Sequence, residues 1–326
     1  MAADPKTPID LSKKETSVDF YERRYSMGYM GHWSSFDKER LAGLIKNLGL
    51  PSTGRALDFG CGRGIFTQVI REVLPGWTIS GCDISAEAID FAKKNIPGID
   101  FFVLGDRTYS EQRFDFIHSH HVLEHTFDEK VTAAEMSSFA AEHCVMLHSL
   151  PCNHEGSLEY RFAQWTKNGF DTATGKFFFE DTAHMRRLNA QQAEALFSGF
   201  HFRLSRKYFS NRFWGAIKWI AESNFGLTWN ISNPFRANSF SSFFRLAVWR
   251  KRLVFFWFCF FAASAFMPAD KGRYYFLKKA LQVICFLLCF WFAIPVARYI
   301  TMKAAKEWEE RKESPDGTDM FLVFER

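Results

Sequence analysis

The stretch ALDFGCGRGIF (residues 56–66) decides the fold. A short apolar run ends at Phe59, glycines follow at positions 60, 62 and 64, and the helical pattern IFTQVIREVL (65–74) begins directly afterwards. A glycine turn between a buried strand and a helix lets the backbone approach a ligand closely and offers it the free N–H groups of the helix start. Because such turns also serve tight packing alone, the neighbouring segments have to decide between the two interpretations.

Outward from this turn, strand and helix patterns alternate. Strands are expected at 55–59, 77–83, 99–106, 113–120, 143–151, 199–209 and 319–326, and helices at 37–50, 65–74, 86–95, 127–143 and 189–197. Short apolar strands separated by helical segments are typical of a parallel sheet covered by helices. The sequence therefore predicts an α/β fold with a doubly wound, seven-stranded, mostly parallel, Rossmann-like sheet.

Two acidic residues close the strands that follow the turn. Asp83 ends the second strand, about twenty residues after the turn, where a carboxylate can bind a ribose diol. Asp106 ends the third strand. The turn reads G-x-G-x-G, which differs from the G-x-G-x-x-G dinucleotide pattern, and the chain contains no GK[ST] of a P-loop.

Three motifs in order, LDFGCGRG (57–64), CDIS (82–85) and FDFIHSHHVLEH (114–125), resemble those of class I S-adenosylmethionine-dependent methyltransferases. The resemblance covers roughly residues 55–205. It implies that the first aspartate and the glycines surround the methionine part of the cofactor, that the second aspartate binds the ribose hydroxyls, and that the third lies near the adenine. The implied S-adenosylmethionine-binding residues are Asp58, Gly60, Gly62, Gly64, Asp83, Ile84, Asp106, His118 and Ser119.

The run HVLEH (121–125) also matches H-x-x-E-H, a spacing used by one group of zinc peptidases. A zinc site needs both histidines on a helix, one turn apart, with a third ligand elsewhere. Here the run continues the tail of a strand, and in the resemblance it opens the segment beside the cofactor. We therefore expect no metal site; a zinc hydrolase remains the alternative. His120 and His121 are candidates to face the methyl acceptor, and we assign His121 to the catalytic set.

Methyl transfer is an in-line displacement that needs alignment of the acceptor, and a base only where the acceptor must lose a proton. For a hydroxyl acceptor, the segment PCNHEGSLEYR (151–161) after the fifth strand offers His154, Glu155 and Glu159. The alternative is a solvated surface loop. The aromatic segment with Tyr21, Tyr25 and Trp33 is either a lid over the cofactor or a helix packed on the domain.

Two apolar runs, LVFFWFCFFAASAFM (253–267) and the stretch from Ala280 to Ile300, precede the last strand. A spanning helix needs ~20 apolar residues, so the second run is long enough and the first is short. Buried core helices are the alternative. The resemblance implies that residues 319–326 form a final antiparallel strand beside the fifth strand. The two apolar runs then form a hydrophobic hairpin inserted between the sixth and seventh strands, and both ends of the hairpin return to the side of the membrane where the sheet lies. Four basic residues in the loop 268–279 favour a shallow hairpin in the cytoplasmic leaflet.

Composition and charge fit a membrane surface. The chain has 38 Phe and a net charge of +5, and residues 203–252 carry ten Lys/Arg against one acidic residue, Glu222. A basic stretch beside aromatic runs indicates anionic lipid more than nucleic acid. The segment 213–229, with Trp214, Ile217 and Trp219, is expected to be an interfacial helix. The seven cysteines form no CxxC pair, and the N-terminus lacks an apolar signal core, so we expect a reducing compartment.

The sequence thus predicts three parts: an N-terminal segment and possible lid (1–36), a methyltransferase domain (37–212 with 317–326) and a membrane-associated helical insertion (213–316). The predicted function is methyl transfer at the cytoplasmic face of a membrane, with the bilayer surface and a lipid or lipid-linked acceptor as partners, and oxygen as the acceptor atom. A non-catalytic membrane scaffold that keeps the fold is the second hypothesis. The intact glycines and Asp83 argue against it.

Overall fold

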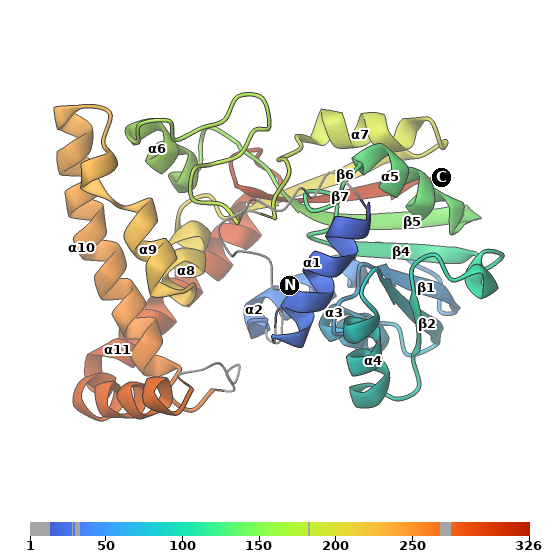
Figure 1. Cartoon of the computed structure of the whole chain (residues 1–326), viewed down its shortest axis with the longest axis horizontal. Helices are drawn as coiled ribbons and strands as arrows, with labels where there is room; N and C mark the ends of the chain where they lie inside the picture. Colours follow the sequence, from blue (N-terminus) through green and yellow to red (C-terminus); the bar gives the residue numbers. More distant parts are fainter. Residues whose placement is uncertain (1–13, 28, 30–32, 182, 268–274) are drawn as a thin grey trace, which may run out of the picture. The chain divides into compact units, whose positions relative to one another are not determined.

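The glycine turn follows the first strand of a seven-stranded sheet (Figure 1). The computed structural model describes residues 14–27, 29, 33–181, 183–267 and 275–326. The strands are β1 (Gly54–Phe59), β2 (Trp77–Asp83), β3 (Asp100–Val103), β4 (Phe114–His120), β5 (Ala140–Pro151), β6 (Arg203–Ser210) and β7 (Asp319–Glu325). Their order across the sheet is β3-β2-β1-β4-β5-β7-β6, and β3, β2, β1, β4 and β5 are joined by parallel pairings. This confirms the predicted doubly wound, mostly parallel sheet.

The final strand, β7, runs against its neighbours. At one end, the Cys152 N–H donates to the Thr318 carbonyl (2.9 Å); at the other, the Arg326 N–H donates to the Cys144 carbonyl (3.1 Å). The start of β7 therefore lies beside the end of β5, which makes this pair antiparallel. The prediction that residues 319–326 complete the sheet beside the fifth strand is confirmed.

The helices follow their sequence signals. Ser85 and Asp128 accept hydrogen bonds from the first turns of α4 and α5, as N-cap residues do. The helices are α1 (Lys14–Ser26), α2 (Ser35–Lys46), α3 (Ile65–Val73), α4 (Ala86–Asn95), α5 (Glu129–Ser138), α6 (Leu158–Trp165), α7 (Ala190–Ser198), α8 (Trp214–Glu222), α9 (Phe225–Ile231), α10 (Phe240–Ala263) and α11 (Tyr275–Arg311), with 3₁₀ turns η1 (Arg107–Tyr109) and η2 (Pro234–Arg236).

Some predicted boundaries were wrong. The helix expected at 127–143 ends at Ser138, and β5 begins at Ala140, which pairs with Phe114 of β4. The segment expected to be a loop after β5 contains α6, whose N-cap is Ser157. No sequence signal was read for it.

The single interfacial helix expected at 213–229 is two helices, α8 and α9. Asn224 separates them, since its side chain accepts from the Leu227 N–H and starts a new helix. Ile217 was expected to anchor in a membrane, but it is only 1% exposed and packs in the core of this region. Trp219, in contrast, is exposed.

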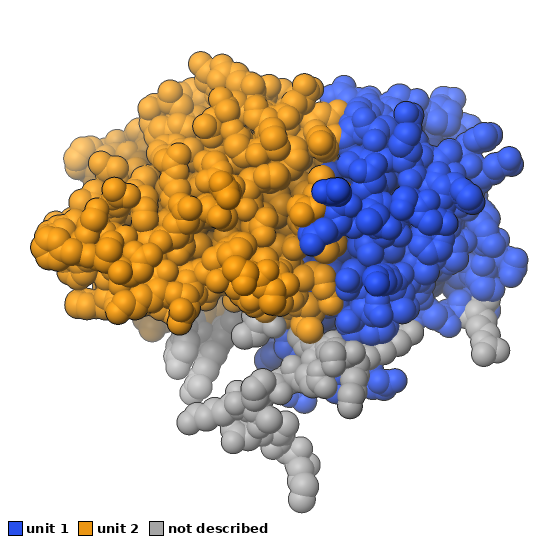
Figure 2. All heavy atoms as spheres, turned by 90° about the horizontal axis from the view of Figure 1, so that it is seen from above, with its two compact units in different colours: residues 1–149, 191–206, 322–326 blue, residues 150–190, 207–321 orange. Residues whose placement is uncertain are grey.

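The chain divides into two compact units, coloured separately in Figure 2. Unit 1 comprises residues 1–149, 191–206 and 322–326, and unit 2 comprises 150–190 and 207–321. The fully buried side chains of unit 1 include Phe59, Phe101 and Phe116. In unit 2, α6, α8, α10 and α11 share one apolar core. Residues 150–190 thus group with the helices after β6, although we expected them in the methyltransferase domain. The functional division into three parts stays a prediction.

Candidate active site

A pocket in unit 1 lies at the ends of β1, β2 and β4. It brings together the glycine turn, the acid that ends β2, the loop after β4 and the aromatic side chains of the N-terminal segment. Its lining includes Asp58, Gly60, Gly62, Asp83, Ile84, His120, His121, His125, Tyr21, Tyr25, Tyr29, Trp33 and Phe66. Ligands of open parallel sheets bind at this edge, outside the carboxyl ends of the strands.

The turn requires glycine for two reasons. Gly60, Gly62 and Gly64 have φ angles of +74°, +53° and +81°, which side chains rarely adopt. A Cβ atom on Gly60 would lie 2.4 Å from Cγ2 of Val122, and one on Gly62 would lie 2.7 Å from the Tyr25 hydroxyl. The backbone of the turn is therefore the wall of the pocket, and a larger residue would fill it.

Asp83 fixes the turn to the end of β2. Its carboxylate is buried and accepts hydrogen bonds from the N–H groups of Gly62 (2.8 Å) and Ser85 (3.0 Å). Burial raises the pKa of Asp83 to about 6, although these two hydrogen bonds act in the opposite direction. The carboxylate is thus ionised near neutral pH and lies in the wall of the pocket. Ribose binding by Asp83 stays a prediction.

Asp58, the last acid before the turn, already has internal partners. It accepts from the Thr67 hydroxyl (2.6 Å) and is 2.7 Å from Nδ1 of His118. His118 is fully buried beneath it and does not line the pocket. Ser119 points to the other face of β4, where its hydroxyl is bonded to Nδ1 of His148 (2.7 Å). Within the described structure, the predicted contact of His118 and Ser119 with a cofactor would therefore be indirect.

Two further predicted residues lie away from the pocket lining. Gly64 starts α3 and faces Ile96 and Phe101. Asp106 is exposed and accepts from the N–H and hydroxyl of Thr108, which lower its pKa. Its predicted role near the adenine stays a prediction.

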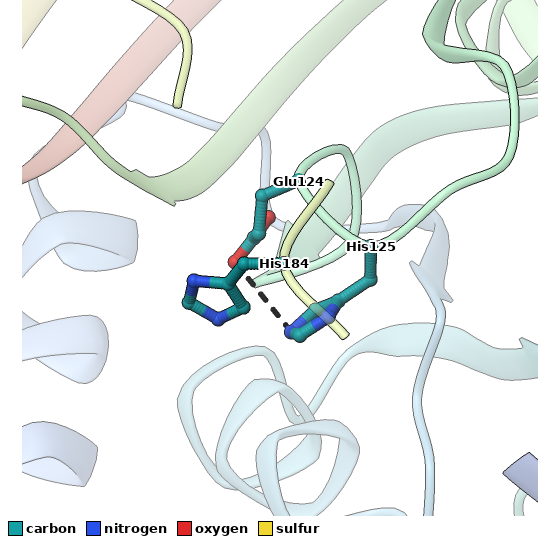
Figure 3. A group of neighbouring side chains, drawn as sticks. All are labelled: Glu124, His125 and His184. Carbon is teal, nitrogen blue, oxygen red and sulfur yellow. Dashed lines mark ion pairs between the residues drawn. The ribbon is translucent and has the colours of Figure 1, made fainter. Parts of the chain in front are cut away.

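The loop after β4 is a non-helical turn. His121 has a positive φ of +54°, and its Nδ1 is 2.7 Å from Oε1 of the fully buried Glu124. Nε2 of His125 lies 4.0 Å from the same oxygen, as the dashed line in Figure 3 marks. Figure 3 also draws His184, which belongs to unit 2 and is bonded through Nδ1 to Glu180 (2.7 Å). HVLEH therefore lacks the helix that the zinc peptidase motif requires.

The N-terminal helix α1 is held to unit 1 at two points. Glu22 accepts hydrogen bonds from the N–H groups of Ala86 (2.6 Å) and Glu87 (3.1 Å) at the start of α4, and the Arg63 guanidinium donates to the Tyr25 carbonyl (2.5 Å). The α1 segment thus packs on the unit, which is one of the two predicted alternatives, and it also lines the pocket. Its role as a lid over the cofactor stays a prediction. A carboxylate at a helix N-terminus is favourable, and Glu22 was missed because its partner is 64 residues away.

The predicted bases after β5 belong to unit 2. His154 packs edge-on against Phe209, and burial lowers its pKa. Glu155 is exposed and accepts from the Tyr160 hydroxyl (3.5 Å). Glu159 lies on α6, is fully buried, and is bonded to the Thr318 hydroxyl; burial raises its pKa to about 7. None of the three lines the pocket of unit 1, and their catalytic role stays a prediction.

The mostly parallel sheet, the glycine turn at the end of β1 and the buried Asp83 beside it are the features of the Rossmann-like class of folds, in which ligands bind at this edge of the sheet. A sequence model of the family described as "Methyltransferase domain" matches residues 33–205, which is more than half of the chain. The chain belongs to this family: it is a class I methyltransferase, and S-adenosylmethionine is its cofactor. The pocket fits that group, because its turn leaves no room for side chains and its wall carries the carboxylates of Asp58 and Asp83 for a cationic ligand.

Individual similarities are more distant. The ribosomal RNA small subunit methyltransferase C of Yersinia pestis (strain Pestoides F) is 32% identical over 99 residues, which is 28% of each chain. A putative methyltransferase from Bacillus halodurans C-125 has a similar structure (TM-score 0.45, 12% identity, 64% of this chain and 88% of that one). Magnesium protoporphyrin IX methyltransferase from Synechocystis PCC 6803, solved with bound SAH, is another (TM-score 0.44, 16% identity, 61% and 94%). The chain thus matches little more than a quarter of the curated relative's length.

Proposed function

We propose that this methyltransferase works at the cytoplasmic face of a membrane and transfers its methyl group to an oxygen of a lipid or lipid-linked acceptor. The observation that carries this proposal is the exposed apolar surface of the helices α10 and α11 in unit 2. The contacts inside that pair, its place in the chain and its charges support the proposal.

Helix α11 is apolar and exposed at the same time. Its most apolar window has a mean hydropathy of 2.3, and only 17% of that window is buried, which differs from the core helix of a soluble protein. Among the described residues, α11 is the one helix long and apolar enough to cross a membrane by length and composition. Its exposed large side chains are Phe276, Leu277, Leu281, Ile284, Leu287, Leu288, Phe290, Trp291, Tyr299 and Met302. A continuous apolar surface of this kind marks a partner or a membrane.

Helices α10 and α11 form a hairpin with small residues between them (Figure 1). Cys259, Ala262 and Ala293 are fully buried at this contact. At the turn end, the Lys279 ammonium donates to the carbonyls of Ala265 (3.1 Å) and Met267 (2.6 Å), so its charge is compensated by the end of the hairpin. Small residues at the contact and large apolar residues outside are the pattern of helices packed in lipid.

The place of the hairpin supports insertion from one side. The strands that flank it, β6 and β7, are neighbours in the sheet, so both ends of the insertion return to the same place. The uncharged part of α10, Leu253–Ala263, spans about 16 Å at 1.5 Å per residue, against a hydrocarbon thickness of about 30 Å. We therefore propose a hairpin that dips into one leaflet. The basic loop expected at its tip lies largely in 268–274, outside the described residues.

The surface charge supports an anionic bilayer. From Ser223 to Ala263 the chain has five Lys/Arg and no acidic residue. The Arg250 guanidinium lies 3.7 Å from the Trp229 ring centroid, and Phe235 and Phe240 are more than three-quarters exposed nearby in the sequence. Arginine beside exposed aromatic rings suits the headgroup region, where each cation near the surface contributes about 1 kcal/mol.

The test is the fate of labelled methyl groups. Full-length protein is incubated with methyl-labelled S-adenosylmethionine and membranes of the expression host, and the lipid, protein and RNA fractions are counted separately. The proposal predicts label in the lipid extract, released on treatment that cleaves methyl ethers or esters. Label confined to protein or RNA would refute the lipid acceptor.

A further inference from the structure

The last residue of β4, His120, has an unusual environment. It is 9% exposed and lines the pocket of unit 1, yet neither of its ring nitrogens has a hydrogen-bond partner among the described residues. Its ring packs against Phe66, with centroids 4.1 Å apart, and meets the edge of Trp33 at 4.8 Å. Two unpaired nitrogens are thus held between aromatic rings in the wall of a binding pocket.

The neighbouring histidines differ from His120 because each uses its Nδ1. His118 is bonded to Asp58 and His148 to Ser119, both at 2.7 Å, on the two faces of the sheet. His121 is bonded to Glu124, also at 2.7 Å. At this end of the sheet, the described structure therefore keeps one imidazole in the pocket wall with both nitrogens buried and unpaired.

An unpaired buried polar group is costly, because it loses its hydrogen bonds to water without gaining others. A hydrophobic side chain of the same shape would avoid this cost, since Phe66 and Trp33 already supply apolar contacts. A partner that is present only when the pocket is occupied explains why both buried nitrogens lack one in the described structure. Unpaired groups in a substrate pocket also discriminate strongly for a ligand that pairs them.

We infer that His120 forms the acceptor subsite and takes the proton of the acceptor hydroxyl. This inference rests on the proposed oxygen acceptor. In the step, the acceptor oxygen forms a bond to the methyl carbon, and the bond between that carbon and the sulfonium sulfur breaks with its electron pair moving to sulfur. The hydroxyl proton moves to the free ring nitrogen of His120, and the other nitrogen keeps its own hydrogen for a donor role. Atoms and charges balance: neutral alcohol, neutral imidazole and sulfonium give a methyl ether, imidazolium and thioether.

The electrostatics of the subsite keep His120 neutral. Burial, and then the nearby His121, His118 and Arg40, hold the pKa of His120 well below its ordinary value, so one ring nitrogen carries no proton before transfer. Arg40 is itself paired with Asp37 at 3.0 Å. Beside His120, the rings of Phe66 and Trp33 offer apolar contacts, which suit an uncharged hydroxyl group.

The test replaces His120 with phenylalanine, which keeps the aromatic packing on Phe66 and Trp33 and removes both nitrogens. His148→Phe is the control, because His148 is also a buried histidine on a central strand, β5, but does not line the pocket. Methyl transfer from labelled S-adenosylmethionine to host-cell lysate is summed over lipid, RNA and protein, so the readout does not depend on which fraction is labelled. Calorimetry with S-adenosylmethionine and thermal melting are measured on each variant.

His120→Phe is expected to lower the transfer rate by about 10²- to 10⁴-fold, the range of general-base catalysis, while the cofactor affinity and the melting temperature hold. His120→Gln, which keeps a hydrogen-bonding side chain without a proton acceptor, should lower kcat with little change in KM. His148→Phe should transfer at the wild-type rate. A His120→Phe rate within threefold of wild type, or a loss that follows cofactor affinity, would overturn the inference. If label enters RNA or protein but the His120 effect holds, the lipid proposal fails and the base assignment survives. No transfer by the wild-type protein to any fraction would contradict both.

Discussion

The pocket of unit 1 and the hairpin of unit 2 use the same kind of side chain in opposite ways. In unit 1, Phe59, Phe101 and Phe116 are almost completely buried on the strands β1, β3 and β4 of the sheet that carries the glycine turn. In unit 2, Phe276 is 85% exposed, and Leu288 and Trp291 are each 69% exposed. The excess of aromatic residues therefore has two causes, a core and an outward apolar surface. Stability should depend on the first and association with lipid on the second.

The largest expected effect is on cofactor binding in unit 1. Asp83→Ala removes the acceptor for the Gly62 and Ser85 N–H groups and a charge in the pocket wall, and charged hydrogen bonds contribute about 1.5–3 kcal/mol each. Calorimetry with S-adenosylmethionine should show affinity lowered by at least about tenfold. Asp100→Ala is the control, because it removes an exposed carboxylate from β3, an edge strand of the same sheet. If the intact protein gave no binding heat, the scaffold hypothesis would replace the enzyme.

A second variant pair isolates the space in the glycine turn. Gly60 and Gly49 both have a φ of +74°, so alanine strains the backbone equally, by about 1–2 kcal/mol. Only at Gly60 would the new Cβ collide with Val122; at Gly49 nothing lies within 4 Å. Gly60→Ala should therefore lower the melting temperature more than Gly49→Ala and weaken cofactor binding. Equal effects of both variants would mean that the turn is not in close contact with the loop after β4.

The sequence predicted the features that depend on residues close together in the chain. It did not predict the contacts between residues that are far apart in the chain. The turn, β1, β2 and Asp83 are local signals, and they lie where the pattern predicted them. Glu22 contacts the start of α4, and His118 is bonded to Asp58. Each contact joins segments about sixty residues apart, so no periodic pattern in the sequence predicts it. Glu159 was predicted to lie in a loop, but it belongs to α6, which begins after the N-cap Ser157. Its partner Thr318 is 159 residues later in the chain. The two apolar helices were predicted because long runs without charged residues are visible in the sequence itself.

The third prediction tests the outward surface. The double variant Leu288→Lys with Trp291→Lys adds two charges to an exposed face of α11, so thermal stability should change by less than about 0.5 kcal/mol. Flotation with phosphatidylcholine–phosphatidylglycerol vesicles should fall at least tenfold, because charges in the hydrocarbon region are costly. Leu57→Lys, at a fully buried position of β1, should instead abolish folding. If the α11 variant lost its cooperative unfolding, this face of α11 would have to be part of a buried core.

The last prediction concerns the pH dependence of stability. The pKa of Glu159 is about 7 in the folded chain against an ordinary 4.5, so folding favours the protonated form. Its contribution to stability is complete below pH 4.5 and is lost as the pH rises towards 7, with a slope of at most about 1.4 kcal/mol per pH unit. Asp83 contributes with the same sign between about 4 and 6. Urea denaturation at pH 5 and pH 7 should give a smaller difference for Glu159→Gln than for wild type. An unchanged difference would mean that Glu159 ionises normally.

The most direct test of the account measures methyl transfer to lipid by wild type and by the Leu288→Lys, Trp291→Lys variant on the same membranes. The account predicts label in the lipid extract for the wild type, and a loss of that label in the variant while calorimetry shows cofactor binding retained. Equal labelling of lipid by both proteins, or label that never enters lipid, would contradict the claim that the exposed hairpin gives the enzyme its acceptor.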